Sequence, residues 1–209
     1  MKKIFKPIAV VATAALFMIT PNNSNAQAFE EESMYISLGY GGPNLSASFF
    51  KTFEDRADYT VNGLGPIHAK FEYAVSDKIG IGMSFNYVRT NVKWNYETID
   101  VNNDPVVYEE GYKFSALAAN ARINWHFVDN DNLDVYYGLG FGYNYSNNEY
   151  YTNDPDGVEG GTFSISGIPI GFETTFGVRY LFNENIGIYA EFGWAKSVVQ
   201  GGLVFKIGQ

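Results

Sequence analysis

Cysteine is absent from this chain of 209 residues, which excludes disulfide bonds and thiol chemistry. Histidine is scarce, with only His68 and His126, so imidazole chemistry has two candidates at most. Basic side chains are also few. The 14 Lys and Arg stand against 23 Asp and Glu, for a net charge of −9, and this acidity argues against nucleic acid as a partner. Beyond the first residues, no apolar run approaches the ~20 residues that a membrane-spanning helix needs.

The N-terminus has the pattern of an export signal. Three lysines lie among the first six residues, Ile8 to Ile19 is an uncharged run of 12 residues, and Ala26-Gln27-Ala28 offers a small-residue cleavage site. The alternative, an N-terminal membrane anchor, is disfavoured because the run is too short to cross a bilayer. We therefore predict a signal peptide over residues 1–28 and one domain over 29–209. Without the three lysines, 11 basic and 23 acidic side chains give a net charge of −12.

The rest of the chain alternates apolar and polar residues in eight segments. Over residues 79–87 of the third, Ile79, Ile81, Met83, Phe85 and Tyr87 share one parity, and the other parity holds only Gly, Ser and Asn. Across the eight apolar sets none of about 40 positions is charged, whereas 18% of the whole chain is charged. A wholly apolar face on every strand, with charges on the other, is typical of a barrel with lipid outside and polar groups inside. The predicted strands are 33–41, 64–76, 79–93, 112–127, 134–146, 167–181, 186–196 and 199–207.

The connections alternate in length. Short polar turns at 76–78, 128–133 and 183–185 alternate with long segments at 42–63, 95–111 and 147–166, and a short fourth segment lies near Ser197. This asymmetry is typical of outer-membrane barrels, with the short turns in the periplasm and the long loops outside. Aromatic residues near the strand ends fit interfacial girdles, although β-propensity alone also favours Tyr and Phe. The sequence thus predicts an all-β fold: an eight-stranded, antiparallel, up-and-down transmembrane β-barrel.

Two strand–turn–strand stretches, 71–82 and 178–191, resemble the eight-stranded outer-membrane barrel family of Gram-negative bacteria, which includes the OmpA transmembrane domain and the OmpX and OmpW barrels. Gln200, Gly202, Phe205 and Ile207 resemble the family's C-terminal assembly signal, although the chain closes with Gly208-Gln209 and not with an aromatic residue. The resemblance implies a monomer in the outer membrane, in contact with its lipid and lipopolysaccharide. It also implies recognition of the last strand by the assembly machinery, and no cofactor.

Charged residues on the inward parity form the first candidate site. We expect them to pair inside the barrel, because an unpaired ion there would cost several kcal/mol. A packed plug is favoured over a gated ion path, because eight strands leave room for little but side chains. The predicted lumen residues are Lys70, Glu72, Arg122, Glu173, Arg179, Glu191 and Lys206.

Catalytic and metal sites are weakly indicated. Some barrels of this kind modify lipid A with a histidine and a serine, but no serine lies within two residues of His126, and His68 neighbours Lys70. A triad assembled from distant residues stays open. The stretches 129–134 and 153–157 carry oxygen ligands, yet the first lacks the glycine and glutamate of a calcium loop, and both fit turns better. We predict no enzyme, no metal and no cofactor.

The long loops are acidic and rich in tyrosine. They form either an interaction surface for a basic partner or for lipopolysaccharide through divalent cations, or merely a hydrated rim. The function predicted is a structural, envelope-integrity or surface-interaction role with a plugged lumen. A narrow channel for small solutes is the alternative, and a lipid A-modifying enzyme is less favoured. The predicted rim residues are Glu54, Asp55, Asp58, Glu97, Asp100, Glu109, Glu110, Asp154 and Asp156.

Overall fold

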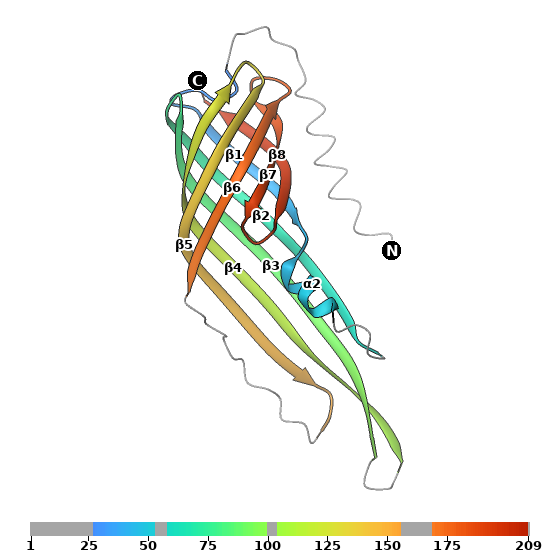
Figure 1. The fold of residues 1–209 in the computed structure, drawn as a ribbon. Coiled ribbons are helices and arrows are strands. Elements are labelled where there is room, and N and C mark those ends of the chain that lie inside the picture. The colour runs from blue at the N-terminus through green and yellow to red at the C-terminus, as the bar shows by residue number, and fades with distance from the viewer. Residues whose placement is uncertain (1–26, 53–57, 100–103, 156–168, 209) are drawn as a thin grey trace.

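The computed structural model describes residues 27–52, 58–99, 104–155 and 169–208 (Figure 1). Eight antiparallel strands close into one barrel in chain order, and the first strand pairs with the last. This confirms the predicted fold class. Among the described residues no helix is both long and apolar enough to cross a membrane. The elements are β1 (Met34–Gly42), α2 (Leu45–Lys51), β2 (Thr60–Ser76), β3 (Ile79–Ile99), β4 (Pro105–Asp129), β5 (Leu133–Thr152), β6 (Ile170–Leu181), β7 (Ile186–Trp194) and β8 (Val199–Ile207).

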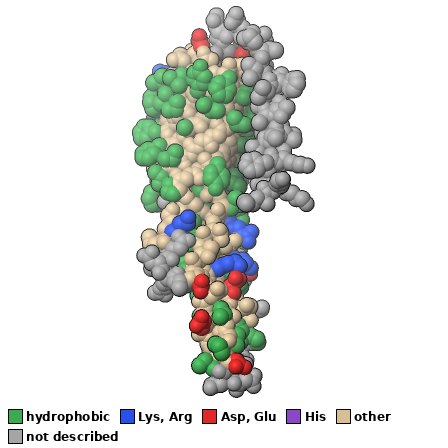
Figure 2. Space-filling view, turned by 90° about the vertical axis from the view of Figure 1, so that its right-hand side faces the viewer, with side chains coloured by type: hydrophobic (Ala, Val, Ile, Leu, Met, Phe, Trp, Pro, Cys, Tyr) green, Lys and Arg blue, Asp and Glu red, His purple; other side chains and the backbone are tan. Residues whose placement is uncertain are grey.

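The outer wall is apolar, as the alternation predicts. Phe141 and Phe192 are each 62% exposed, while their inward neighbours are buried or line the bore. Ile186 is an exception: it shares the parity of the exposed Ile188 on β7 but is only 7% exposed at the start of that strand. Hydrophobic side chains cover the end of the barrel that carries the described termini, and charged side chains gather beyond them (Figure 2). An apolar band next to a charged one is what a hydrocarbon–water boundary requires.

Three strands run much farther than their apolar pattern indicated. β3, β4 and β5 form a sheet that projects from the barrel, and β3 and β4 stay paired as far as Ile99 and Pro105 (Figure 1). The prediction of a long loop over 95–111 was therefore wrong. Beyond the apolar band both faces of a strand meet water or aromatic neighbours, so period-two apolarity is lost while the backbone ladder continues.

The base of the projecting sheet has a small core of its own. Asn44 caps α2 by accepting a hydrogen bond from the Ala47 backbone N–H at 3.0 Å. Ala47 then packs with Val61 and Val92, and Tyr59 and Trp94 flank them. α2 lies within the segment that the sequence left as a loop at 42–63. Capping and packing together fix this short helix against β2 and β3.

Residues 27–33 close the end of the barrel that carries the short turns. Phe29 is fully buried, in a cluster with Tyr35, Leu181 and Val204. The Tyr35 hydroxyl donates to the Ala28 carbonyl at 3.1 Å, and the Ala28 N–H donates to the Asn130 carbonyl at 2.9 Å. The N-terminal segment is thus part of the folded domain and not a free tail.

Candidate functional site

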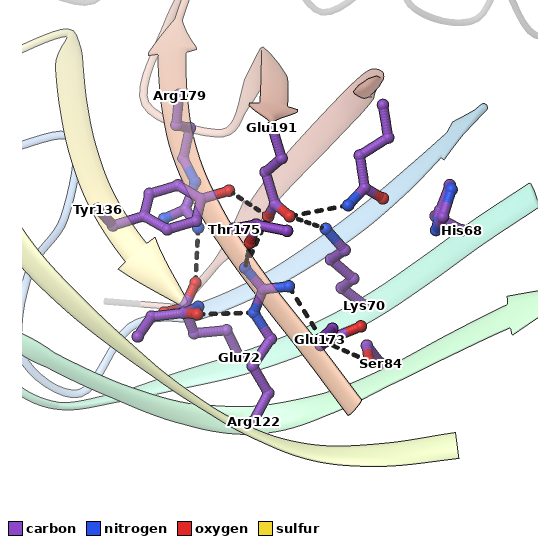
Figure 3. Close-up of polar contacts among 12 residues, drawn as sticks. His68, Lys70, Glu72, Ser84, Arg122, Tyr136, Glu173, Thr175, Arg179 and Glu191 are labelled. Carbon is purple, nitrogen blue, oxygen red and sulfur yellow. Dashed lines mark hydrogen bonds and ion pairs between the residues drawn. The ribbon is translucent and has the colours of Figure 1, made fainter. Parts of the chain in front are cut away.

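The interior of the barrel holds a stack of buried charges, most of which Figure 3 shows. The layer nearest the short turns is built on Glu72 from β2. Its carboxylate accepts from Arg179 Nη2 at 2.6 Å and from His126 Nε2 at 2.9 Å. Asp134, at the start of β5, lies 2.7 Å from His126 Nδ1 and 3.3 Å from Arg179 Nη1. All four side chains are buried, so each charge is compensated locally.

The middle layer joins β4 to β7 and β2. Arg122 donates from Nη2 to Glu191 at 2.9 Å, and Lys70 Nζ lies 2.5 Å from the other oxygen of Glu191. The Tyr136 hydroxyl donates to Glu191 at 2.7 Å, and Gln200 donates to it at 2.9 Å. Glu191 therefore receives four contacts from four strands across the bore.

The outer layer is centred on Glu173 of β6, which is fully buried. Arg122 Nη1 reaches Glu173 at 3.1 Å and so links the middle and outer layers. The Ser84 hydroxyl donates to Glu173 at 2.7 Å, and Asn86 and Asn120 donate to its second oxygen. The bore is thus crossed by one connected network that joins both ends of the charged region (Figure 3).

The network is close to charge neutrality. It contains three basic side chains, Lys70, Arg122 and Arg179, and four carboxylates, those of Glu72, Glu173, Glu191 and Asp134. Both ring nitrogens of His126 face carboxylate oxygens, and both can donate only when the imidazole is protonated. With His126 as the fourth cation, the charges balance.

Inward-facing glycines make room for this network. A Cβ at Gly138 would lie 2.2 Å from Arg122 Nη2, and one at Gly140 would lie 2.5 Å from Glu173 Cγ. On β3, a Cβ at Gly80 would meet the Glu72 carboxylate at 2.0 Å. The glycine-rich inner parity is therefore needed for space around large charged side chains in a narrow bore.

Six of the seven predicted lumen charges lie in this network. Lys206 is buried too, but it lies apart at the end that carries the short turns, where Nζ donates to the Gln27 carbonyl at 2.9 Å and to Glu30 at 3.0 Å. Sequence reasoning missed Asp134 and the ionic role of His126. Asp134 lies two residues before Tyr136, which faces the bore, so the alternation along β5 could have identified Asp134 as an inward residue.

The two histidines lie at opposite ends of the bore, and His68 meets a serine from the end of the chain. His68 Nε2 is 3.0 Å from Ser197 Oγ, and Nδ1 is 2.5 Å from Asn86 Oδ1. A hydroxyl, an imidazole and an orienting amide in this order are the parts of a nucleophilic triad. Ser197 is only 2% exposed, however, and a Cβ at Gly41 would lie 2.1 Å from its hydroxyl. The three residues hold the β7–β8 turn against β2 and β3.

The rim carboxylates that the structure describes mostly tie strands together. Glu109 pairs with Lys93 at 2.8 Å, Glu110 accepts from the Trp94 ring nitrogen at 3.1 Å, and Asp154 accepts from the Tyr96 hydroxyl at 2.6 Å. Asp58 and Glu97 are exposed. The other predicted rim residues lie outside the described residues: Glu54, Asp55, Asp100 and Asp156.

Hydrogen bonds to two of these carboxylates raise the pKa values of two tyrosines in the projecting sheet. The hydrogen bond to the Asp154 carboxylate favours the neutral phenol and raises the pKa of Tyr96 above its usual range. The Glu110 carboxylate likewise raises the pKa of Tyr150 to about 12. In the part of the chain that the structure describes, no group of three His, Asp or Glu side chains is placed to hold a metal ion.

A closed barrel with an apolar wall and an ionic interior is a transmembrane β-barrel of the outer-membrane type. Residues 10–201 match the family described as outer membrane protein beta-barrel domain, and the chain belongs to this family. No curated protein matches the chain.

Solved structures with a similar fold share little sequence with it. Ail, the attachment invasion locus protein of Yersinia pestis, in complex with the heparin analogue sucrose octasulfate, is 16% identical, with a TM-score of 0.42 over 85% of this chain and 99% of that one. The N-terminal β-barrel domain of Pseudomonas aeruginosa OprF is 13% identical, with a TM-score of 0.35 over 85% and 98%. A de novo designed transmembrane β-barrel is 14% identical, with a TM-score of 0.34 over 90% and 100%.

Proposed function

We propose that this protein is a non-conducting, non-enzymatic barrel in the outer membrane of a Gram-negative bacterium, which it reaches by means of a cleaved signal peptide. It anchors the projecting sheet of β3, β4 and β5 at the cell surface, where that sheet serves envelope integrity or surface interaction. The last strand, β8, is the segment that the outer-membrane assembly machinery recognises.

The observation that carries the proposal is the continuous network across the bore. Arg122 contacts both Glu173 and Glu191, and the side chains of all three are 3% exposed or less. An ion passing this level would have to break several charge-assisted hydrogen bonds in a desolvated space. We therefore infer that the packed interior stabilises the barrel and does not conduct ions.

The decisive experiment is conductance of the refolded full chain in planar bilayers. The wild-type protein is expected to give no discrete current steps. The double variant Lys70→Ala, Glu191→Ala removes one charge of each sign from the middle layer and is expected to conduct. Lys78→Ala, at an exposed periplasmic turn, is the matched control and is expected to stay silent.

Stepwise current from the wild-type protein would favour the narrow channel instead. The heat-dependent gel shift of each variant shows whether it is folded, so silence from an unfolded variant is not counted. Hydrolysis is less favoured because Ser197 is only 2% exposed, which leaves a substrate little access to its hydroxyl.

A further inference from the structure

We propose that a polar cavity at the end of the bore away from the C-terminus, the mouth cavity, binds a small zwitterion: an α-amino acid with an apolar side chain. Lys196 contacts the carboxylate of this ligand, and the side-chain oxygen of Asn120 accepts a hydrogen bond from its ammonium group. Trp194 and Phe172 contact its apolar side chain. The inference goes beyond the proposed function and does not depend on whether the bore conducts.

The mouth cavity lies where the barrel wall is incomplete. β6 is paired with β5 from Ile170 onward, but its pairing with β7 starts only at Thr174, which lies opposite Trp194. The Gly193 N–H donates to the Val198 carbonyl at 2.9 Å and closes the short β7–β8 hairpin at this level. Among the described residues the first part of β6 therefore has a paired strand on one side only. At this notch polar residues of the bore meet apolar residues of the outer wall.

The size of the mouth cavity fits a small molecule. Its volume is about 280 Å³. A water molecule takes up about 30 Å³ in the liquid, so this space corresponds to roughly nine waters, or to a ligand with a similar number of non-hydrogen atoms. Its main polar lining is Asn120, Asn144, Glu173 and Lys196, and its largest apolar side chains are Phe172 and Trp194.

Asn120 supplies an unpaired acceptor to the cavity. Its side chain is 2% exposed, and its Oδ1 has no hydrogen-bond donor among the described residues. The amide nitrogen donates to Glu173 at 3.3 Å and to the Ser84 hydroxyl at 3.4 Å, so turning the amide over would place its oxygen against a carboxylate. The oxygen faces Gly171, another lining residue, where an added Cβ would lie 2.2 Å from it. Because a buried acceptor without a donor is unfavourable, this position favours a ligand that carries a donor.

Lys196 supplies a cation without a carboxylate partner. Its Nζ donates to Asn144 Oδ1 at 2.5 Å, and no Asp or Glu of the described ranges pairs with it. Partial burial lowers the pKa of Lys196, because the ammonium group has lost part of its hydration. A ligand carboxylate at this position would compensate the charge and so favour the protonated amine.

The acceptor and the cation are spaced for the two ends of one small molecule. Asn120 lies opposite Gly142 on β5, and Asn144 is two residues farther along that strand. Diagonal neighbours of this kind on one face of a sheet are roughly 7–8 Å apart. That span holds an ammonium group and a carboxylate on one carbon atom, with a hydrogen bond of about 2.9 Å at each end.

The charges around the cavity favour a zwitterion over a simple acid. The fully buried carboxylate of Glu173 lies behind the Asn120 amide, and Arg122 pairs with the oxygen of Glu173 that Asn120 does not contact. A ligand ammonium group at Asn120 thus approaches a carboxylate, while the ligand carboxylate approaches an amine. The apolar part of the ligand then lies toward Phe172 and Trp194, which are 52% and 64% exposed.

NMR of the refolded full chain in detergent micelles, labelled with ¹⁵N-asparagine, tests the proposal. The side-chain amide signals of Asn120 and Asn144 are followed during titration with L-leucine. Three probes are compared with it: leucinamide, which lacks the carboxylate; the α-hydroxy analogue, whose donor is neutral; and the deaminated acid, which has no donor. We expect saturable shifts of both signals with L-leucine and at least fivefold weaker binding of each other probe.

Two variants each remove one end of the site. Lys196→Met removes the cation, and Gly171→Ala places a methyl group against the Asn120 oxygen; each should weaken binding of L-leucine at least fivefold. Lys51→Met, at the exposed end of α2, and Gly42→Ala, where an added Cβ meets nothing within 4 Å, are the matched controls. Both should bind like the wild type.

Three results would overturn the proposal: no saturable shift with L-leucine, equal binding of all four probes, or binding that is unchanged in both Lys196→Met and Gly171→Ala. The heat-dependent gel shift shows that each variant is folded before it is titrated. Bilayer current from the wild type would bear only on the plugged bore, because the mouth cavity lies beyond the charged network.

Discussion

The rings of Phe29 and His126 stack with centroids 3.4 Å apart and planes 7° apart, so the N-terminal segment sits directly on the ionic network. We predict that Phe29→Ala destabilises the barrel by about 3 kcal/mol, as expected for loss of a buried aromatic side chain. Urea unfolding in detergent micelles measures this loss. Phe49→Ala is the control, because Phe49 is 62% exposed and should cost far less. A variant of Phe29 as stable as the wild type would contradict the role of this segment as a structural cap.

The mature N-terminus is predicted to be Gln27. The Gln27 carbonyl accepts from Lys206 and the Ala28 carbonyl accepts from Tyr35, so a chain starting at Phe29 would lose both contacts. The sequence pattern favoured cleavage near Phe29, two residues later. The intact mass of protein purified from outer membranes distinguishes residues 27–209 from residues 29–209, and the shorter mass would refute this boundary.

Arg122 is predicted to be the most sensitive position of the network. Arg122→Ala leaves Glu173 and Glu191 without their shared cation, and a broken buried ion pair costs about 3–5 kcal/mol. Lys93→Ala breaks an exposed pair of the projecting sheet and should cost less than about 1 kcal/mol. Equal effects of the two variants in chemical unfolding would show that the interior charges are not tightly coupled.

Ser197 is predicted to be structural. Ser197→Ala removes the 3.0 Å contact to His68 and should lower stability by about 1 kcal/mol, the usual worth of one hydrogen bond. A fluorophosphonate probe should not label the wild-type protein, because the hydroxyl is closed in. Labelling that disappears in the Ser197→Ala variant would instead reveal a working nucleophile.

The Tyr96–Asp154 contact predicts a titration. The carboxylate stabilises the protonated phenol, so the raised pKa of Tyr96 should fall toward about 10 in Asp154→Asn, which lacks the charge. Tyr150, whose pKa of about 12 depends on Glu110, is the internal control and should not move. NMR of ¹³C-labelled tyrosine follows both residues, and an unchanged Tyr96 would show that the contact does not form in solution.

The sequence predicted the barrel because hydrocarbon imposes period two on every strand that crosses it. Ile81 and Phe85 show this pattern plainly, whereas Tyr96 and Tyr108 lie in the projecting sheet, where no such constraint acts. The same reasoning identified Glu72 and Arg179 as inward charges, since parity alone decides which way a side chain points. It could not pair them, because partners such as Arg122 and Glu191 are joined only by closure of the ring.

The contact between His68 and Ser197 is the clearest case that the sequence could not predict. These residues are 129 positions apart in the sequence. No local pattern relates them, and the contact exists only because β2 and the β7–β8 turn flank β1 at the end of the bore away from the C-terminus.

The pairing of Met34–Gly42 with Val199–Ile207 has a consequence for biogenesis. The two halves of this seam come from the first and last strands of the domain, so a polypeptide cut short by even one strand would present a bare row of amides to acyl chains. Insertion is therefore all-or-none with respect to length, and truncated products are expected to be cleared by proteases before they reach the bilayer.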